Sequence, residues 1–256
     1  MSGGSLSVAV LISAGRHPVS GFPRACRGDA VAMALGHRLA GSSLRVVHAG
    51  ALADPSLPDY LALGAGRIDV VAIADGDDAM PALAAQSKGV DLILTGQQSE
   101  QGEGSGLLPY LIAKALQRPV IADALRVDIG AGEVVVRQFL PKGKRRLIAA
   151  PFPLVVAVHP MAPVKLNYAY AQRVAGRIEL TPASPTPCGA SSVWTVEPEK
   201  RCPVRLKAQD IADAHDRMMS YIQTPSKGGT VAFDGSPVDK AQILLSYLRE
   251  HRLIDF

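Results

Sequence analysis

The segment from Asp91 to Leu116, DLILTGQQSEQGEGSGLLPYLIAKAL, constrains the fold of this chain more than any other. It starts as an apolar run, breaks into a glycine-rich loop and continues as an apolar-faced helix, a pattern that predicts a strand, a loop and a helix. In an α/β domain such a junction points backbone N–H groups, at the positive end of a helix dipole, toward the carboxyl edge of the sheet. Nucleotide phosphates are commonly held at that edge.

Strand-like and helix-like segments alternate along the first part of the chain, with short connections. Continuous apolar runs predict buried strands at Leu6–Ser13, Leu44–Gly50, Ile68–Ala74 and Asp91–Thr95. Helical spacing predicts helices at Asp29–Leu39, at Pro55–Leu63 and from the Asp75–Asp78 cap to Ser87. Asp29 is available as the N-cap of the first helix, and Gly41 as its stop. This alternation predicts an α/β fold with a doubly wound parallel sheet and right-handed crossovers, in which Gly15–Arg27 is a polar loop.

The pattern changes after Pro119. Short runs separated by turn sequences predict a small antiparallel hairpin insertion at Ala124–Asp128, Glu133–Phe139 and Arg145–Ala149. A further buried strand is predicted at Pro153–His159, then a loop over Pro160–Tyr170 and a helical piece that ends at Gly176. A proline-rich arm at Thr181–Pro203 and amphipathic helices at Lys207–Gln223 and Val238–Arg252 complete the chain. We therefore expect an α/β nucleotide-binding domain over residues 1–180 and an arm with C-terminal helices over residues 181–256.

Composition argues against several classes of function. The net charge of +4 is mild and the aromatic content is 5%, which disfavours a surface that stacks nucleic-acid bases. The 3 cysteines form no CxxC pair and the 6 histidines show no metal-ligand spacing, so neither a disulfide framework nor a metal site is predicted. The N-terminal apolar run has no basic region before it and is too short to span a bilayer. A cytoplasmic protein without a membrane span is expected.

The loop from Gln97 to Gly106 matches neither standard phosphate-binding motif. No Gly-Lys-Ser/Thr follows it, and no GxGxxG follows the first strand. Three glycines and two serines remain before the helix, so a nucleotide site and an ordinary flexible connection stay equally open. Glu100 and Glu103 would repel a phosphate unless they point away, bind a ribose hydroxyl or are bridged by a cation.

No catalytic constellation accompanies this loop. The sequence contains no G-x-S-x-G, no H-E-x-x-H and no paired carboxylates at strand ends. Its acidic cluster of Asp75, Asp77 and Asp78 is explained by a helix N-terminus. The chain is therefore expected to hold a ligand and not to catalyse a reaction by itself.

From Tyr60 to Glu179 the chain resembles the β subunit of electron transfer flavoproteins. The resemblance rests on YLALGAGRIDVV, on the 91–116 segment, on the hairpin that contains Arg137, and on PLVVAVHP. It implies a sheet of the adenine nucleotide α-hydrolase-like type and a heterodimer with a larger α subunit. FAD would be bound chiefly by that α subunit, and AMP would be held structurally in this chain. Electrons would pass from a dehydrogenase to a quinone reductase without a bond-making side chain here.

In this family the counterpart of the glycine-rich loop wraps AMP, usually through a G-K/R-Q-A-I-D-x-D-x-x-Q run followed by a proline. Gly96, Gln98 and Pro109 match that run in register, whereas Gln97, Gln101 and Gly106 depart from it, and Arg24-Ala25 replaces an Asn-Pro before the first helix. Carried onto this sequence, the resemblance implies AMP contacts from the first two strands, the turn before the first helix and the loop. These residues are Ala9, Cys26, Arg27, Ala49, Gly96, Gln97, Gln98, Ser99, Gln101, Gly102, Glu103, Gly104, Ser105, Gly106 and Leu107.

The family's loop for docking a dehydrogenase corresponds here to Pro160–Tyr170. The expected contacts are Pro163, Lys165, Leu166, Tyr168 and Tyr170. This stretch departs from the usual N-x-P-R-Y, which implies a flavin dehydrogenase other than the acyl-CoA type. The loop Ser13–Arg24, which in the family approaches the flavin, is shorter than usual. Two alternatives remain: a stand-alone nucleotide-binding protein without electron transfer, and an enzyme that acts on the bound nucleotide.

Overall fold

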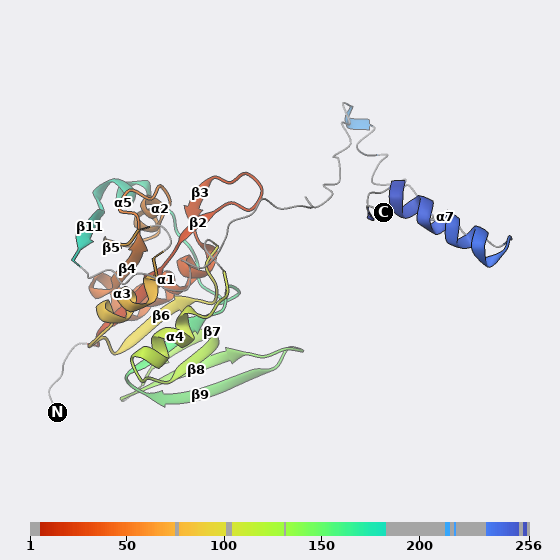
Figure 1. The fold of residues 1–256 in the computed structure, drawn as a ribbon. Helices are drawn as coiled ribbons and strands as arrows, with labels where there is room; N and C mark the ends of the chain where they lie inside the picture. Colours follow the sequence, from red (N-terminus) through yellow and green to blue (C-terminus); the bar gives the residue numbers. More distant parts are fainter. Residues whose placement is uncertain are drawn as a thin grey trace. The chain divides into compact units, whose positions relative to one another are not determined.

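The computed structural model describes residues 6–74, 77–100, 104–130, 132–182, 213–215, 218, 234–250 and 253–254. The chain divides into two compact units, residues 1–196 and 197–256. The larger unit contains the sheet and the helices that cover it (Figure 1).

Nine strands form the central sheet of the larger unit. They are β1 Val8–Ile12, β4 Arg45–Gly50, β5 Arg67–Ala72, β6 Leu92–Gly96, β7 Val120–Ile129, β8 Glu133–Phe139, β9 Arg145–Pro151, β10 Leu154–Val158 and β11 Arg177–Thr181. Their order in the sheet is β11-β5-β4-β1-β6-β10-β7-β8-β9. The strands from β11 to β7 in this order run parallel, and β8 and β9 continue the sheet in antiparallel pairing.

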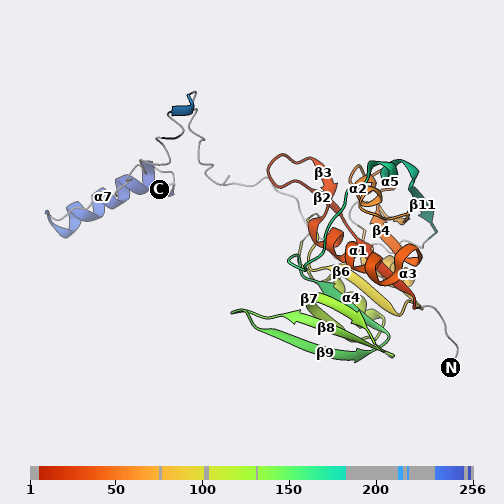
Figure 2. The ribbon, with the colours of Figure 1, turned by 180° about the vertical axis from the view of Figure 1, so that it is seen from behind.

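Helices cover both faces of the parallel strands. They are α1 Arg27–Ala40, α2 Leu57–Ala62, α3 Ala79–Gln86 and α4 Leu108–Ala115, and a further helix, α5 Tyr170–Ala175, contacts α2. Figure 1 shows α3 and α4 in front of the sheet, and Figure 2 shows α1 on the opposite face. The predicted doubly wound α/β fold is therefore confirmed.

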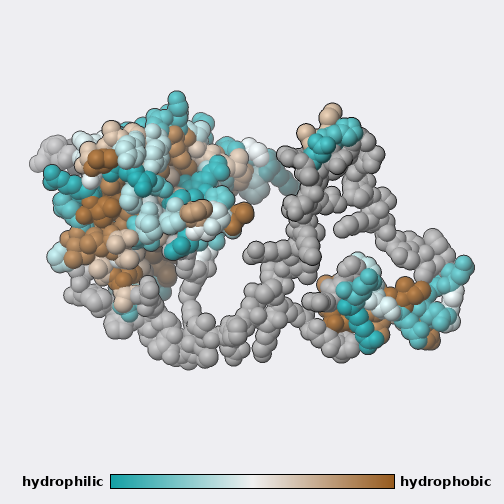
Figure 3. Space-filling view, turned by 90° about the horizontal axis from the view of Figure 1, so that it is seen from above, coloured by the Kyte–Doolittle hydropathy of each residue, from teal (hydrophilic) through white to brown (hydrophobic). Residues whose placement is uncertain are grey.

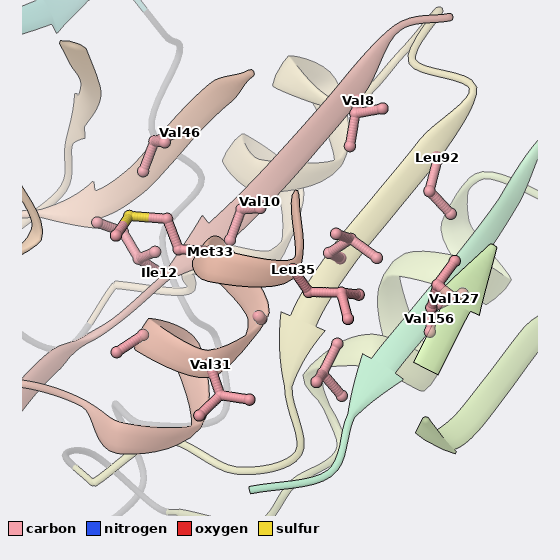
Figure 4. Close-up of a cluster of buried hydrophobic side chains, with 14 of the residues drawn as sticks. Val8, Val10, Ile12, Val31, Met33, Leu35, Val46, Leu92, Val127 and Val156 are labelled. Carbon is pink, nitrogen blue, oxygen red and sulfur yellow. The ribbon is translucent and has the colours of Figure 1, made fainter. Parts of the chain in front are cut away.

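The two faces have separate hydrophobic cores because side chains alternate along each buried strand. Val8, Val10 and Ile12 of β1 belong to the cluster that contains α1 and α2, whereas Ala9 and Leu11 belong to the cluster that contains α3 and α4. Figure 4 shows the first cluster, with Met33 and Leu35 of α1 pointing toward the strands. The loops that follow the parallel strands lie at the carboxyl edge of the sheet, outside both cores.

Three short strands differ from the predicted pattern. Ala14–Arg16 (β2) and Pro23–Ala25 (β3) pair as an antiparallel hairpin, so Gly15–Arg27 is not a loop throughout. The strand β11, which the sequence pattern did not predict, pairs in parallel with β5 at one edge of the sheet. The predicted antiparallel strands are present, but they extend the main sheet from β7 and do not form a separate layer.

In the smaller unit, α7 Pro237–Glu250 confirms the helix predicted at Val238–Arg252. Hydrophobic and hydrophilic side chains both lie on its surface (Figure 3), and Val238, Ile243, Leu244 and Tyr247 are exposed. The helix predicted at Lys207–Gln223 and the arm predicted at Thr181–Pro203 lie largely outside the described residues. Within the described ranges, no helix combines the length and the apolar character that crossing a membrane would need.

Candidate functional site

The loops that follow β1 and β6 meet at one place on the carboxyl edge of the sheet. From β1 the chain continues outward through β4 and β5, and it then returns to β6 on the other side of β1. In doubly wound sheets, ligands bind in the crevice at such a reversal of strand order. Here the crevice lies beside the N-terminal end of α1, which begins at Arg27.

Asp29 joins the two loops beneath this crevice. Its Oδ2 accepts hydrogen bonds from Ser13 N at 2.8 Å and from Ser13 Oγ at 2.5 Å, and its Oδ1 accepts one from Gly96 N at 3.0 Å. Ser13 follows β1 and Gly96 ends β6. The prediction that Asp29 caps the first helix is therefore wrong, because Cys26 occupies the N-cap position and the Asp29 carboxylate binds the strand ends instead.

Burial controls the charge state of this carboxyl group. The Asp29 residue is 5% exposed, and burial raises its pKa to about 6, while the hydrogen bonds from Ser13 and then Gly96 act in the opposite direction. The ionised form therefore predominates at neutral pH because donors from two strand ends compensate part of the desolvation.

Tyr60 of α2 forms hydrogen bonds in the same region, with the chain after β1 and with the residue before α1. Its hydroxyl donates to Ser13 O at 2.8 Å and accepts from Cys26 N at 2.8 Å. The side chain is fully buried, and burial, followed by the charge of Asp29, raises the pKa of Tyr60 well above its ordinary value. A neutral hydroxyl thus links the end of β1 to the start of α1.

The Tyr60→Phe variant is expected to lose about 2 kcal/mol of unfolding free energy, because the Cys26 amide and the Ser13 carbonyl lose their buried partner. Urea unfolding followed by far-UV circular dichroism measures this loss. Tyr110→Phe is the matched control, since Tyr110 is exposed on α4, and its effect should stay within about 0.5 kcal/mol. Equal effects of the two substitutions would contradict the role of the Tyr60 hydroxyl.

The loop after β6 curls back on itself before α4. Gly104 and Gly106 have φ angles of 56° and 69°, in the left-handed region that favours glycine. A Cβ on Gly106 would lie only 3.0 Å from Gln97 O, and Gln98 Nε2 donates to Gly104 O within the same loop. Residues 97–98 and 104–106 of this loop therefore contact each other, and residues 101–103 lie outside the described part of the chain.

A cavity of about 700 Å³ opens where the two loops and the start of α1 meet. Among its described lining residues, Arg16, Arg24 and Arg27 are positively charged, whereas Glu100 supplies the one carboxylate. An excess of basic groups in a concave site raises the local concentration of anions. The cavity therefore favours a negatively charged ligand.

Glu100 lies at the N-terminal end of α1. Its Oε1 accepts hydrogen bonds from Arg24 Nη2 at 2.9 Å and from Arg27 N at 3.2 Å. The carboxylate of Glu100 is therefore paired with an arginine and with the first N–H group of the helix. Glu103 lies outside the described residues.

Several of the residues predicted to contact the nucleotide come together around this cavity. Its lining includes Cys26, Arg27, Gln97, Gln98, Ser99 and Gly104. The Cys26 sulfur donates to Gln98 O at 3.7 Å, and burial, as the largest influence, raises the pKa of its thiol. Gly96 lies beneath, where its N–H binds Asp29. The turn before α1 and the loop after β6 thus share one wall of the cavity.

Other predicted contacts are not brought to the cavity. Ala9 lies in the middle of β1 and is 1% exposed, and Ala49 is on β4, so neither lines it. Ser105, Gly106 and Leu107 lead into α4 without lining the cavity, and Gln101, Gly102 and Glu103 lie outside the described residues. Four residues of the site were not predicted from the sequence, namely Arg16, His17, Asp29 and Tyr60. For Arg16 and His17, their position just after a predicted strand was the available signal.

The predicted docking segment is fixed to α2. Ala169 N donates to Ala62 O at 2.8 Å, and Arg173 Nη1 donates to Asp59 Oδ1 at 2.6 Å and to the Tyr168 hydroxyl at 2.7 Å. All the residues predicted for docking are exposed, namely Pro163, Lys165, Leu166, Tyr168 and Tyr170. The segment therefore combines a held backbone with an open surface.

The fold and this cavity define a doubly wound α/β protein with an anion-attracting crevice at the strand-order reversal. Over the described ranges, no group of three His, Cys, Asp or Glu residues is placed to hold a metal ion. Residues 27–184 match the model of the electron transfer flavoprotein domain. The chain is also similar to electron transfer flavoprotein subunit beta of Chromohalobacter salexigens, at 33% identity over 257 residues, covering 98% of this chain and 96% of that relative. The chain therefore belongs to the electron transfer flavoprotein β-subunit family, and the resemblance seen in its sequence is confirmed.

Proposed function

We propose that this chain is the β subunit of a heterodimeric electron transfer flavoprotein, with FAD bound chiefly by an α subunit and AMP bound here. The observation that carries the proposal is the 33% identity, over 98% of the chain, to a protein named subunit beta. In this role the chain is part of an electron carrier and is not an enzyme by itself.

The cavity at the strand-order reversal fits AMP in size and in chemistry. Its volume of about 700 Å³ is in the range of small-molecule sites. Arg16, Arg24 and Arg27 complement a phosphate, and the curled loop after β6 carries backbone N–H groups near the cavity. We assign AMP contacts first to the predicted residues that line the cavity, and second to Gln101, Gly102 and Glu103 of the same loop.

FAD would supply the group that accepts and releases electrons, and this chain would form one wall of its site. The β2–β3 hairpin supports that assignment because Val19 and Phe22 near its tip are 89% and 71% exposed. His17 holds the turn, since its Nδ1 accepts from Val19 N at 3.3 Å and from Ser20 N at 3.2 Å. An exposed apolar tip on a held turn suits contact with a partner chain.

The redox partners would dock on the surface around Pro160–Tyr170. We assign this surface to a flavin dehydrogenase other than the acyl-CoA type, with a quinone reductase as the electron acceptor. The domain over residues 1–180 would hold the nucleotide, and the segment over residues 181–256 would embrace the α subunit. We place this complex in the cytoplasm.

Co-expression with a flavoprotein-like α subunit from the same genome tests the proposal. The expected result is a yellow heterodimer, and mass spectrometry of the denatured complex should detect released AMP. A colourless monomer that ignores every candidate partner would contradict electron transfer and favour a stand-alone nucleotide-binding protein. A well-folded yellow heterodimer without AMP would contradict only the AMP assignment.

A further inference from the structure

The first turn of α1 is already engaged by groups of the chain itself. Arg27 N donates to Glu100, and Ala30 N donates to Cys26 O at 2.9 Å. The N–H groups of Gly28 and Asp29 interact with the Cys26 sulfur, an interaction that lowers the pKa of the thiol against the larger effect of burial. A helix N-terminus normally offers such groups to an anionic ligand. Here the N–H groups of Arg27 and Ala30 are both hydrogen-bonded within the chain.

The anion at this helix end is the Glu100 carboxylate. It combines the two features that recognise a phosphate, a backbone N–H at the start of a helix and an arginine, and both reach its Oε1. The Glu100 side chain is 23% exposed and belongs to the cavity wall. It therefore occupies a position that the cavity would otherwise offer to a ligand.

Arg24 has a donor that Glu100 does not engage. Its Nη2 binds Glu100, whereas its Nε is shielded from solvent and has no hydrogen-bond partner among the described residues. A guanidinium can bind a carboxylate or a phosphate through two donors at once. The Nε–H group of Arg24 is thus a donor that Glu100 leaves unused.

We propose that Glu100 is an internal competitor for the phosphate of the bound nucleotide. Its carboxylate occupies the N-terminus of α1 and Arg24 until a phosphate displaces it. This inference rests on the proposed AMP role of the cavity. In this role Glu100 sets the specificity of the cavity. A ligand without phosphate can enter without displacing the Glu100 carboxylate, whereas the phosphate of AMP must replace that carboxylate.

The test compares the nucleotide-stripped full chain with its Glu100→Gln variant by isothermal titration calorimetry, with AMP and adenosine as ligands. Glutamine keeps the size of the side chain but removes the competing charge. The dissociation constant for AMP should fall about tenfold to hundredfold in the variant, whereas that for adenosine should change less than about threefold. Glu100→Ala is a second variant, and circular dichroism checks that both fold.

Glu179→Gln is the matched control. Glu179 lies on β11, does not line the cavity and pairs with Arg67 at 3.0 Å, so its removal deletes an arginine pair without touching the cavity. AMP binding should be unchanged in this control. Equal AMP affinity in the wild type and both Glu100 variants would overturn the competitor role alone. No AMP binding by any folded variant would overturn both this role and the proposed AMP site.

Discussion

The Asp29→Ala variant is expected to be about 3 kcal/mol less stable than the wild type at pH 7. Removal of the carboxylate leaves Ser13 N, Ser13 Oγ and Gly96 N without their acceptor. Each unsatisfied buried group costs about 1–3 kcal/mol, and the loss of a buried charge offsets part of the sum. Urea unfolding followed by far-UV circular dichroism measures the difference.

Asp91→Ala is the control for this variant. Asp91 immediately precedes β6, at the end of the strand opposite to Gly96. Its Oδ2 accepts one backbone hydrogen bond, from Ser7 N at 2.9 Å. Its removal should cost about 1 kcal/mol, because one donor is released instead of three. If both variants lose the same free energy, Asp29 does not join the two loops in the way that its contacts indicate.

The difference in stability between the wild type and Asp29→Ala should change with pH. The pKa of Asp29 is about 6 in the folded chain, against an ordinary value of 3.8, so the folded state retains this proton to higher pH than the unfolded state. The contribution of Asp29 to stability is therefore greatest below about pH 4 and declines until the pH passes about 6. The stability gap between the wild type and Asp29→Ala should be about 1 kcal/mol larger at pH 5 than at pH 7. A gap that shrinks toward pH 5 would show that the pKa of Asp29 is not raised.

The main sheet could be predicted because the local composition of its buried strands indicates where they lie in the sequence. β1, β6 and β10 are fully buried, and each appears in the sequence as a continuous apolar run. β2 and β3 carry no such signal, since they are three residues each and contain Gly, Arg and Pro. β11 is partly exposed at the sheet edge, so its five residues lack the apolar run that marks the inner strands. The position of a strand could therefore be predicted from the sequence where the whole strand is buried.

The junction under the cavity could not be predicted for a different reason. An aspartate near the start of a helical run is ordinarily an N-cap, and this local rule placed Asp29 there. Its actual partners, Ser13 and Gly96, are 16 and 67 residues away in sequence. The partner of Glu100 is likewise distant, since Arg24 precedes it by 76 residues. The glycine loop indicated where a ligand site would form, but the fold alone determines which charges meet there.

Gly96→Ala is expected to destabilise the chain by about 3 kcal/mol, because α1 approaches the end of β6 too closely for a side chain. A Cβ on Gly96 would collide with Asp29 Oδ1 and would lie 3.0 Å from both Asp29 N and Gly28 C. Backbone atoms of a helix cannot yield without moving the helix, and overpacking of this kind typically costs about 1–3 kcal/mol. The displaced carboxylate would also lose its hydrogen bond from Gly96 N.

Gly28→Ala is the matched control, because Gly28 faces Gly96 from the other side of the same contact. A Cβ on Gly28 would lie 3.6 Å from Gly96 Cα, which is an ordinary van der Waals distance. Gly28 is also the second residue of α1, where alanine favours the helix by up to about 1 kcal/mol over glycine. The two substitutions add the same methyl group and should shift the urea midpoint in opposite directions, downward for Gly96→Ala and unchanged or upward for Gly28→Ala. Equal midpoints for the two variants would mean that the close approach of α1 to β6 does not depend on Gly96.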